Sequence, residues 1–167
     1  MPLDVETLFR EHNVPLFRYL IRLSGDEAMA KDAVQHAFLR MLEQQPDGAH
    51  PRAWLYTVAT NVVRDWTSRD RRRKALVEGR GEPGPLGSPE PLPDEGLEAR
   101  EEARRVRLAL ASLSVRDRTI LLMRSQGFRH REIADAVGTT VGSVGTMISR
   151  AVERFARALG PARGEAG

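Results

Sequence analysis

Residues 130–144 read HREIADAVGTTVGSV and hold the strongest structural signal in this 167-residue chain. Ala134 is small where two helices must approach closely, and Gly138 follows four residues later, where a turn needs a positive φ. Val144 and Ile148 then return to a shared apolar core. This spacing predicts a helix-turn-helix unit, a motif that places its second helix in the major groove of DNA. A plain helical hairpin with a glycine turn is the alternative.

The second helix of this unit is expected to begin near Val141. Its outward polar face, together with one cation ahead of the first helix, supplies candidate duplex contacts: Arg129, Thr140, Ser143, Thr146, Met147, Arg150 and Arg154. Threonine is a good N-cap, and the positive end of a helix can meet a phosphate. An arginine on this face can bond a base edge or a phosphate.

A linker separates this unit from a second helical region. Five Gly and five Pro fall within residues 79–96, a composition that neither helix nor sheet tolerates. We therefore predict a flexible linker at 75–96, which spans roughly 70 Å when extended. The rest shows helical periodicity and no strand alternation, so the fold is predicted to be all-α, with helical domains at 1–74 and 97–160 and a disordered tail at 161–167.

Helix boundaries follow from apolar spacing and from capping residues. The expected helices are 5–23, 27–44, 51–70, 97–112, 115–126, 130–137 and 141–158. Gly25 suits a helix C-cap, Asp26 an N-cap and Pro51 a first helical position. The apolar stripes predict that Leu42 and Trp54 face the core.

Charge is unevenly distributed along the chain. Residues 61–74 hold six basic and two acidic side chains, and residues 114–160 hold eight Arg and four acids. Residues 75–96, between them, hold one Arg and five acids. Two basic segments around an acidic spacer are typical of a polyanion binder with two contact regions, although ordinary solvated helix faces would give a similar balance.

The composition argues against several other classes. The chain has no cysteine, which excludes disulfides and thiolate metal sites and fits a reducing cytoplasm. It shows no signal peptide, no apolar run long enough for a membrane helix, and no phosphate loop or nucleophile elbow. Asp32 and His36 stand four residues apart, but without a third ligand nearby we expect no metal site. We expect neither a cofactor nor an enzyme.

Two further features belong to the first domain. Asn61 lies mid-helix beside an apolar stripe, and its amide offers both donors and an acceptor for a base edge. The same helix carries a phosphate-binding set of cations: Arg64, Arg69, Arg71, Arg72, Arg73 and Lys74. On the preceding helix, one polar face includes an exposed leucine and is a candidate docking surface: Asp32, Gln35, His36 and Leu39.

Three segments together resemble bacterial RNA polymerase sigma factors, and the short two-domain layout resembles their extracytoplasmic-function group. These segments are DAVQHAFLR at 32–40, WLYTVATN at 54–61 and the helix-turn-helix motif at 130–155. The likeness covers nearly the whole chain apart from the linker and tails. The ordered pair of motifs, about 70 residues apart, is far more specific than either motif alone.

The resemblance implies a set of partners and roles. The face around Leu39 would dock on the clamp helices of the polymerase β′ subunit, and residues 97–160 would read the minus-thirty-five element and touch the β flap. Asn61 and the loop 45–50, with Asp47 and His50, would hold a base flipped from the melted minus-ten element. Promoter DNA would thus be bound both as duplex and as single strand, in the cytoplasm and at the nucleoid. An anti-sigma factor is a further possible partner, and no membrane insertion is implied.

The sequence departs from the family pattern at four positions. His36 stands where the family usually has Glu, and Ser114 replaces a common Pro but can also cap a helix. Gly145 and Met147 stand where basic residues are usual on the recognition helix. The competing interpretation is a stand-alone helix-turn-helix regulator that binds duplex DNA without polymerase. Such a regulator would have no need of Asn61 or of a clamp-binding face.

Overall fold

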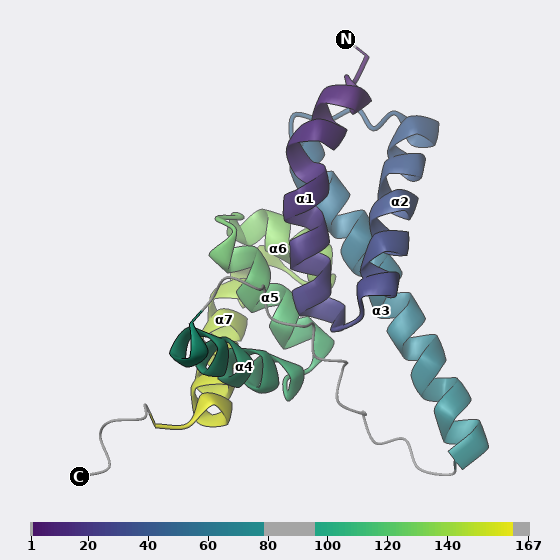
Figure 1. The fold of residues 1–167 in the computed structure, drawn as a ribbon. Helices are drawn as coiled ribbons and strands as arrows, with labels where there is room; N and C mark the ends of the chain where they lie inside the picture. The colour runs from purple at the N-terminus through teal and green to yellow at the C-terminus, as the bar shows by residue number, and fades with distance from the viewer. Residues whose placement is uncertain (1, 79–95, 162–167) are drawn as a thin grey trace.

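Helices alone make up the regular structure of the described residues, 2–78 and 96–161 of a computed structural model (Figure 1). They are α1 (Val5–Ser24), α2 (Glu27–Gln44), α3 (Pro51–Glu78), α4 (Leu97–Ala111), α5 (Val115–Ser125), α6 (His130–Val137) and α7 (Val141–Leu159). Helices α1–α3 lie side by side, and α4–α7 form a second group beside them. The predicted all-α class is confirmed.

The ends of α1 and α2 follow the capping residues of the sequence. Gly25 closes α1 in the left-handed conformation, with φ 69°, which glycine adopts without strain. Asp26 caps α2, since its carboxylate accepts a hydrogen bond from the Met29 N–H at 3.1 Å. Pro51 is the first residue of α3, where its missing N–H costs nothing.

Helix α3 is longer than expected. It continues to Glu78, so residues 71–78 extend the predicted helix and residues 75–78, assigned above to the linker, are helical. No Gly or Pro occurs between Pro51 and Gly79, so nothing in the chain stops the helix earlier. Its C-terminal end projects away from the bundle (Figure 1). Residues 79–95 of the predicted linker and 162–167 of the predicted tail lie outside the described residues, whereas Gly96, the last residue of the predicted linker, is the N-cap of α4.

Local capping residues also determine where the helices of the second group begin and end. The Ser114 hydroxyl caps α5 by accepting a hydrogen bond from the Asp117 N–H at 3.1 Å, which confirms that serine serves at this position. Gly138 ends α6 with φ 70°, the positive value predicted for the turn before α7. Gly127, with φ 81°, turns the chain after α5 and sends Phe128 into the core.

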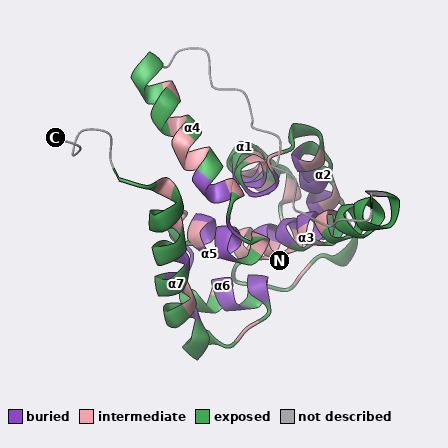
Figure 2. Cartoon of the chain, turned by 90° about the horizontal axis from the view of Figure 1, so that it is seen from below, coloured by how far each residue is buried: buried purple, intermediate pink, exposed green. Residues whose placement is uncertain are grey.

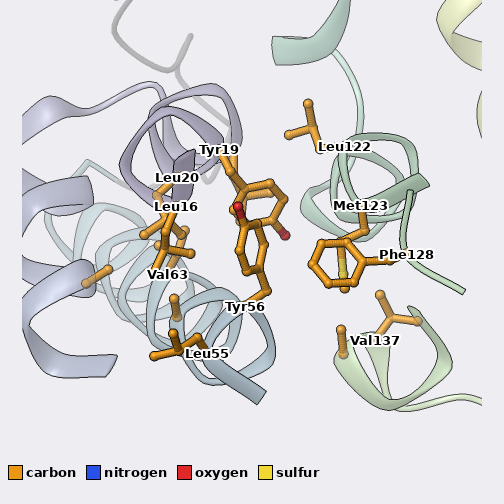
Figure 3. Packing of buried hydrophobic residues seen from close by; sticks show 14 of the residues in the cluster. Leu16, Tyr19, Leu20, Leu55, Tyr56, Val63, Leu122, Met123, Phe128 and Val137 are labelled. Carbon is orange, nitrogen blue, oxygen red and sulfur yellow. The ribbon is translucent and has the colours of Figure 1, made fainter. Parts of the chain in front are cut away.

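The hydrophobic core runs without a break through both groups of helices (Figure 3). The ring centroids of Tyr19 and Tyr56 lie 4.9 Å apart, and the ring of Phe128, from the second group, packs at a tilt with its centroid 4.8 Å from that of Tyr56. The Tyr19 hydroxyl is bonded to the Thr60 hydroxyl at 2.8 Å, and burial raises the pKa of Tyr19 well above that of a free phenol. The two predicted domains therefore share one interior, which the sequence did not indicate.

Two apolar residues differ from their predicted environment. Leu42 is 52% exposed rather than buried, because the inward face of α2 is already occupied by Phe38 and Met41. Trp54 is only half-buried and lines a cleft between α3 and α6. Figure 2 shows the general pattern, with buried residues facing the centre and exposed residues on the outer helix faces.

Candidate nucleic-acid interface

Helices α6 and α7 form the unit that the motif predicted. Ala134, Val144 and Ile148 are all buried, with 1%, 0% and 7% of their surfaces exposed. The small alanine and the two branched residues thus hold α6 against α7, and Gly138 makes the turn between them. The outward face of α7 is left for a ligand, as in a helix that enters the major groove.

Most residues predicted for duplex contact lie on this outward face. Thr140, Ser143, Thr146 and Arg150 are exposed, and all four fall on α7 or at its N-cap. Thr140 occupies the N-cap as predicted, but its hydroxyl lies 2.8 Å from the Ser143 hydroxyl and makes no capping bond to the backbone. The face therefore offers two hydroxyls near the positive end of α7 and a guanidinium nearly three turns further along.

Two other predicted duplex contacts have partners inside the protein. Met147 is half-buried, and its sulfur accepts a contact from the Arg116 guanidinium at 3.8 Å. Arg154 forms an ion pair with Asp117 of α5, with 2.7 Å between Nη1 and Oδ2. The Asp117 side chain is only 11% exposed, so Arg154 neutralises a largely desolvated charge. Arg154 thus has a structural role, whereas its contact with DNA stays a prediction.

Helix α3 carries the predicted minus-ten residues. Asn61 is exposed and lies between buried neighbours, Thr60 and Val62, so its amide reaches solvent from a helix fixed in the core. Asp47 and His50 are exposed in the connection before α3. The cationic residues of the projecting end are also exposed: Arg69, Arg71, Arg72, Arg73 and Lys74.

Arg64 differs from the other cations of α3 that were predicted to contact DNA. It is half-buried, and its guanidinium donates a hydrogen bond to the carbonyl oxygen of Ala136 in α6 at 3.3 Å. A residue predicted to meet DNA is thereby engaged with the helix-turn-helix unit of its own chain. Sequence reasoning gave no sign of this contact, because the acceptor is a backbone atom.

The residues of the predicted docking face lie on the outer side of α2. Asp32, Gln35 and Leu39 are exposed, and Leu39 shows 58% of its surface. His36 is half-buried, and its ring meets that of Trp66 on α3 edge to face, with centroids 6.4 Å apart. An exposed leucine framed by polar groups on one rigid helix is suited to docking another protein.

A cleft of about 410 Å³ brings together His50, predicted to contact the minus-ten element, and Arg129, predicted to contact the minus-thirty-five duplex. His50, Trp54 and Thr57 contribute from the α3 side, and Arg129 and Arg131 from the α6 side. Arg129 is also the N-cap of α6, and its backbone N–H donates a hydrogen bond to the Glu132 carboxylate at 2.7 Å. Glu132 and Asp135 complete the polar lining, so the cleft contains both signs of charge.

Within the described ranges, no three His, Asp or Glu side chains gather as a metal site would require. None of the helices described is long and apolar enough to cross a membrane. The functional features are thus a helix-turn-helix unit, a cationic helix end and a docking face. A helix-turn-helix unit together with an exposed cationic helix end is typical of a DNA-binding protein.

Comparison with known proteins identifies the family. The sigma-70 region 2 model matches residues 8–73, and the sigma-70 region 4 model matches residues 103–155. The chain belongs to the sigma-70 family of RNA polymerase sigma factors, in the extracytoplasmic-function group. The two matches fall on the two helical groups and in the order that the resemblance implied.

Individual relatives agree with this assignment. The chain is 34% identical to the ECF RNA polymerase sigma factor SigL of Mycobacterium tuberculosis, over 89% of this chain and 84% of that protein. It is 26% identical to RNA polymerase sigma factor YlaC of Bacillus subtilis, over 89% and 87%. The fold matches sigma factor RpoE of Bartonella quintana, solved with the anti-sigma factor NepR, with TM-score 0.66, 22% identity and coverage of 93% and 96%.

Proposed function

We propose that this chain binds core RNA polymerase and directs it to promoters, where it recognises and opens the DNA. The observation that carries the proposal is the match of both sigma-70 regions to a chain whose predicted contact faces are exposed. The relatives bear the name of RNA polymerase sigma factors, which supports the same function for this chain.

Polymerase binding is proposed for the outward face of α2. Leu39 would insert into an apolar spot on the β′ clamp helices, and Asp32 and Gln35 would supply polar contacts at its edge. His36 stands where the family usually has Glu, so we expect one charged contact of the family's interface to be absent here. The edge-to-face contact with Trp66 fixes the orientation of the imidazole instead.

Promoter opening is proposed for α3 and the connection before it. Unstacking and unpairing a base costs a few kcal/mol, so a factor that melts DNA must bind the unpaired strand more tightly than the duplex. The exposed Asn61 amide can hydrogen-bond the edge of a flipped base, with Asp47 and His50 nearby in the chain. The cations at the projecting end of α3 would hold the adjacent phosphates.

Duplex recognition is proposed for α7. Arg150 is exposed on the recognition face, where its guanidinium can form paired bonds with a guanine. Thr140 and Ser143 would contact phosphates near the N-terminal end of the helix. Because Gly145 brings no cation to this face, we expect a weaker minus-thirty-five contact than a basic residue would give. The same domain would touch the β flap.

Three further aspects complete the proposal. An anti-sigma factor is a proposed regulator, and the complex of RpoE from Bartonella quintana with NepR supports this idea by analogy. A cytoplasmic, nucleoid-associated location follows from this function, because a factor that acts at promoters must reach the chromosome. The chain is proposed to have no catalytic activity of its own, since sigma factors in general are not enzymes.

The test is transcription in vitro with purified components. Core polymerase and a genomic promoter library are incubated with and without the chain, and the transcripts are sequenced. We expect new start sites that core polymerase alone ignores, and a matched Leu39→Asp variant should lose them together with polymerase binding. Duplex binding without any polymerase-dependent transcript would instead favour the stand-alone regulator.

A further inference from the structure

Three arginines cross between the two helical groups, and each donates to a backbone carbonyl at the end of a helix. The bonds join Arg118 to Leu23 at 2.7 Å, Arg52 to Gln126 at 3.1 Å and Arg64 to Ala136 at 3.3 Å. The last carbonyls of a helix lack partners within it, so a guanidinium is well placed there. Arg52 and Arg64 both belong to α3, and together they hold it against the two ends of segment 126–136, which contains α6. The walls of the cleft between α3 and α6 are therefore set by the fold itself.

The α3 wall of this cleft presents an aromatic ring between two polar groups. His50, Trp54 and Thr57 line it and are spaced four and three residues apart, which places them on one helix face. The Trp54 N–H bonds to the His50 carbonyl at 3.1 Å, so the helical spacing already holds at His50. An indole offers a flat apolar surface on which a planar ring can stack. This wall therefore favours a ligand that contains an aromatic ring.

The α6 wall carries opposite charges that are separated along the helix. Arg129 and Arg131 stand at its start, and Asp135 follows four residues after Arg131, about 6 Å along the axis. None of the ion pairs found among residues 2–78 and 96–161 includes any of these three side chains. The carboxylate of Glu132, the other acid of the cleft, already accepts the Arg129 N–H. Two guanidiniums and one carboxylate thus face the cleft without a charged partner in the described part of the chain.

These groups together specify the chemistry of a ligand. Guanidiniums bind phosphate through paired hydrogen bonds, so one end of the ligand is expected to be a phosphate. An ionised carboxylate only accepts hydrogen bonds, so the other end must donate them. Among the common nucleobases, guanine presents adjacent N–H donors at N1 and N2, whereas adenine and cytosine place an acceptor beside the amino group. Pockets for small ligands measure about 300–1,000 Å³, so a cleft of about 410 Å³ has room for one nucleotide.

We propose that the cleft between α3 and α6 binds a guanine nucleotide. The base stacks on Trp54 and donates from N1 and N2 to the Asp135 carboxylate, and the phosphate is held by Arg129 and Arg131. A free nucleotide is favoured over a guanine within a nucleic-acid strand, because the acidic side chains of the cleft repel the further phosphates of a strand. The site does not rest on the function proposed above, since it requires only the cleft and its side chains.

Binding can be followed through the tryptophan of the cleft itself. The sequence contains two tryptophans, so Trp66→Phe leaves Trp54 as the only indole and keeps an aromatic ring beside His36. Guanosine monophosphate should quench the Trp54 emission until the site is saturated, and calorimetry on the parent chain should give the same dissociation constant. It should bind about tenfold more tightly than adenosine monophosphate or inorganic phosphate. Absence of binding to the parent, or equal affinity for the two nucleotides, would overturn the proposal.

Two substitutions at exposed positions separate the base contact from the phosphate contact. Asp135→Asn should weaken guanosine monophosphate about tenfold without weakening adenosine monophosphate, because only guanine donates twice to the carboxylate. Arg131→Ala should weaken both nucleotides and inorganic phosphate alike. Asp65→Asn and Arg10→Ala are the matched controls, since both residues are exposed and lie outside the cleft. An equal loss for both nucleotides in Asp135→Asn would show that Asp135 does not read the base.

A further comparison distinguishes a free nucleotide from a guanine in a single strand. A trinucleotide with a central guanine offers the same base with a phosphate on either side. Both ligands are titrated against the Trp66→Phe chain, because Trp54 emission does not report strands held at the cationic end of α3. Guanosine monophosphate should quench at the lower concentration. Quenching by the trinucleotide at the lower concentration would overturn the proposal and assign the cleft to unpaired nucleic acid.

Discussion

Arg154 of α7 and Asp117 of α5 form an ion pair inside the helix-turn-helix domain, with 2.7 Å between Nη1 and Oδ2. The carboxylate is 11% exposed, and the Asp117 N–H is itself bonded to the Ser114 hydroxyl that caps α5. One arginine on α7 thus secures the start of the neighbouring helix. Arg150 lies one turn earlier on α7 and is exposed, so we expect it to contact DNA instead.

The first prediction separates these two arginines. Arg154→Ala leaves a largely buried carboxylate without its partner and should lower the free energy of unfolding by about 1–3 kcal/mol. Arg150→Ala should leave that free energy unchanged and weaken duplex binding by ~1–3 kcal/mol if it reads a base. Urea denaturation and a DNA-binding titration on both variants provide the measurements. Equal stabilities for the two variants would remove the structural role of Arg154.

The second prediction concerns Asn61. Asn61→Ala should abolish promoter opening while polymerase binding persists, because the lost amide is exposed on α3 and distant in sequence from the docking face of α2. The substitution should not harm the fold, since alanine is favoured over asparagine in a helix by roughly 0.5–0.7 kcal/mol. Permanganate reactivity of unpaired thymines reports opening, and a polymerase-binding titration serves as the control. Normal thymine reactivity would show that Asn61 holds no flipped base.

The third prediction contrasts two glycines of the helix-turn-helix unit. A Cβ at Gly145 meets nothing within 4 Å, so Gly145→Ala should stabilise α7 by about 0.5–1 kcal/mol. Gly138→Ala has equal space but a φ of 70°, and should destabilise the domain by about 1–2 kcal/mol. Denaturation curves of both variants check the opposite signs. A destabilising effect of Gly145→Ala would contradict the prediction, because it would mean that other atoms of the protein fill this space in solution.

The fourth prediction is a pH dependence from His12. Burial lowers the pKa of His12, the nearby Arg52 lowers it further, and Glu11 partly offsets them, so the folded value lies below the ordinary 6.5. As the pH falls through 6.5, the unfolded chain takes up a proton before the folded chain does. The free energy of unfolding should therefore decrease on acidification and level off below the folded pKa.

His12→Gln removes this titration. The variant should show a shallower loss of stability between pH values just above and below 6.5 than the parent chain. Thermal unfolding followed at a series of pH values is sufficient for the comparison. An identical slope for both chains would mean that the environment of His12 does not disfavour its charged form.

Local signals in the sequence were reliable guides to the helices. Gly25, Asp26 and Pro51 stand at the ends they predicted, and Gly138 has the positive φ that the turn requires. The predicted end of α3 was wrong because the first helix-breaking residue after Pro51 is Gly79, and the residues just before it favour a helix. Capping and breaking residues act within a few positions, so a sequence displays them directly.

Contacts between segments far apart in the chain have no comparable local signal in the sequence. Arg52 and Arg118 look like ordinary cations in the sequence, because their acceptors are backbone atoms that carry no side-chain signature. The ring of Phe128 packs on that of Tyr56 across the interface, and no local pattern in the sequence pairs these two residues. The individual contact residues lie on the predicted faces, whereas their roles in binding remain predictions.

The backbone acceptors of the three crossing arginines have an evolutionary consequence. Every residue offers the same carbonyl, so Leu23, Gln126 and Ala136 can each drift to another helix-compatible residue without removing the acceptor. Selection on the contact would then act on the arginines alone. A search for compensating pairs of substitutions would overlook these three hydrogen bonds even in a large set of homologues.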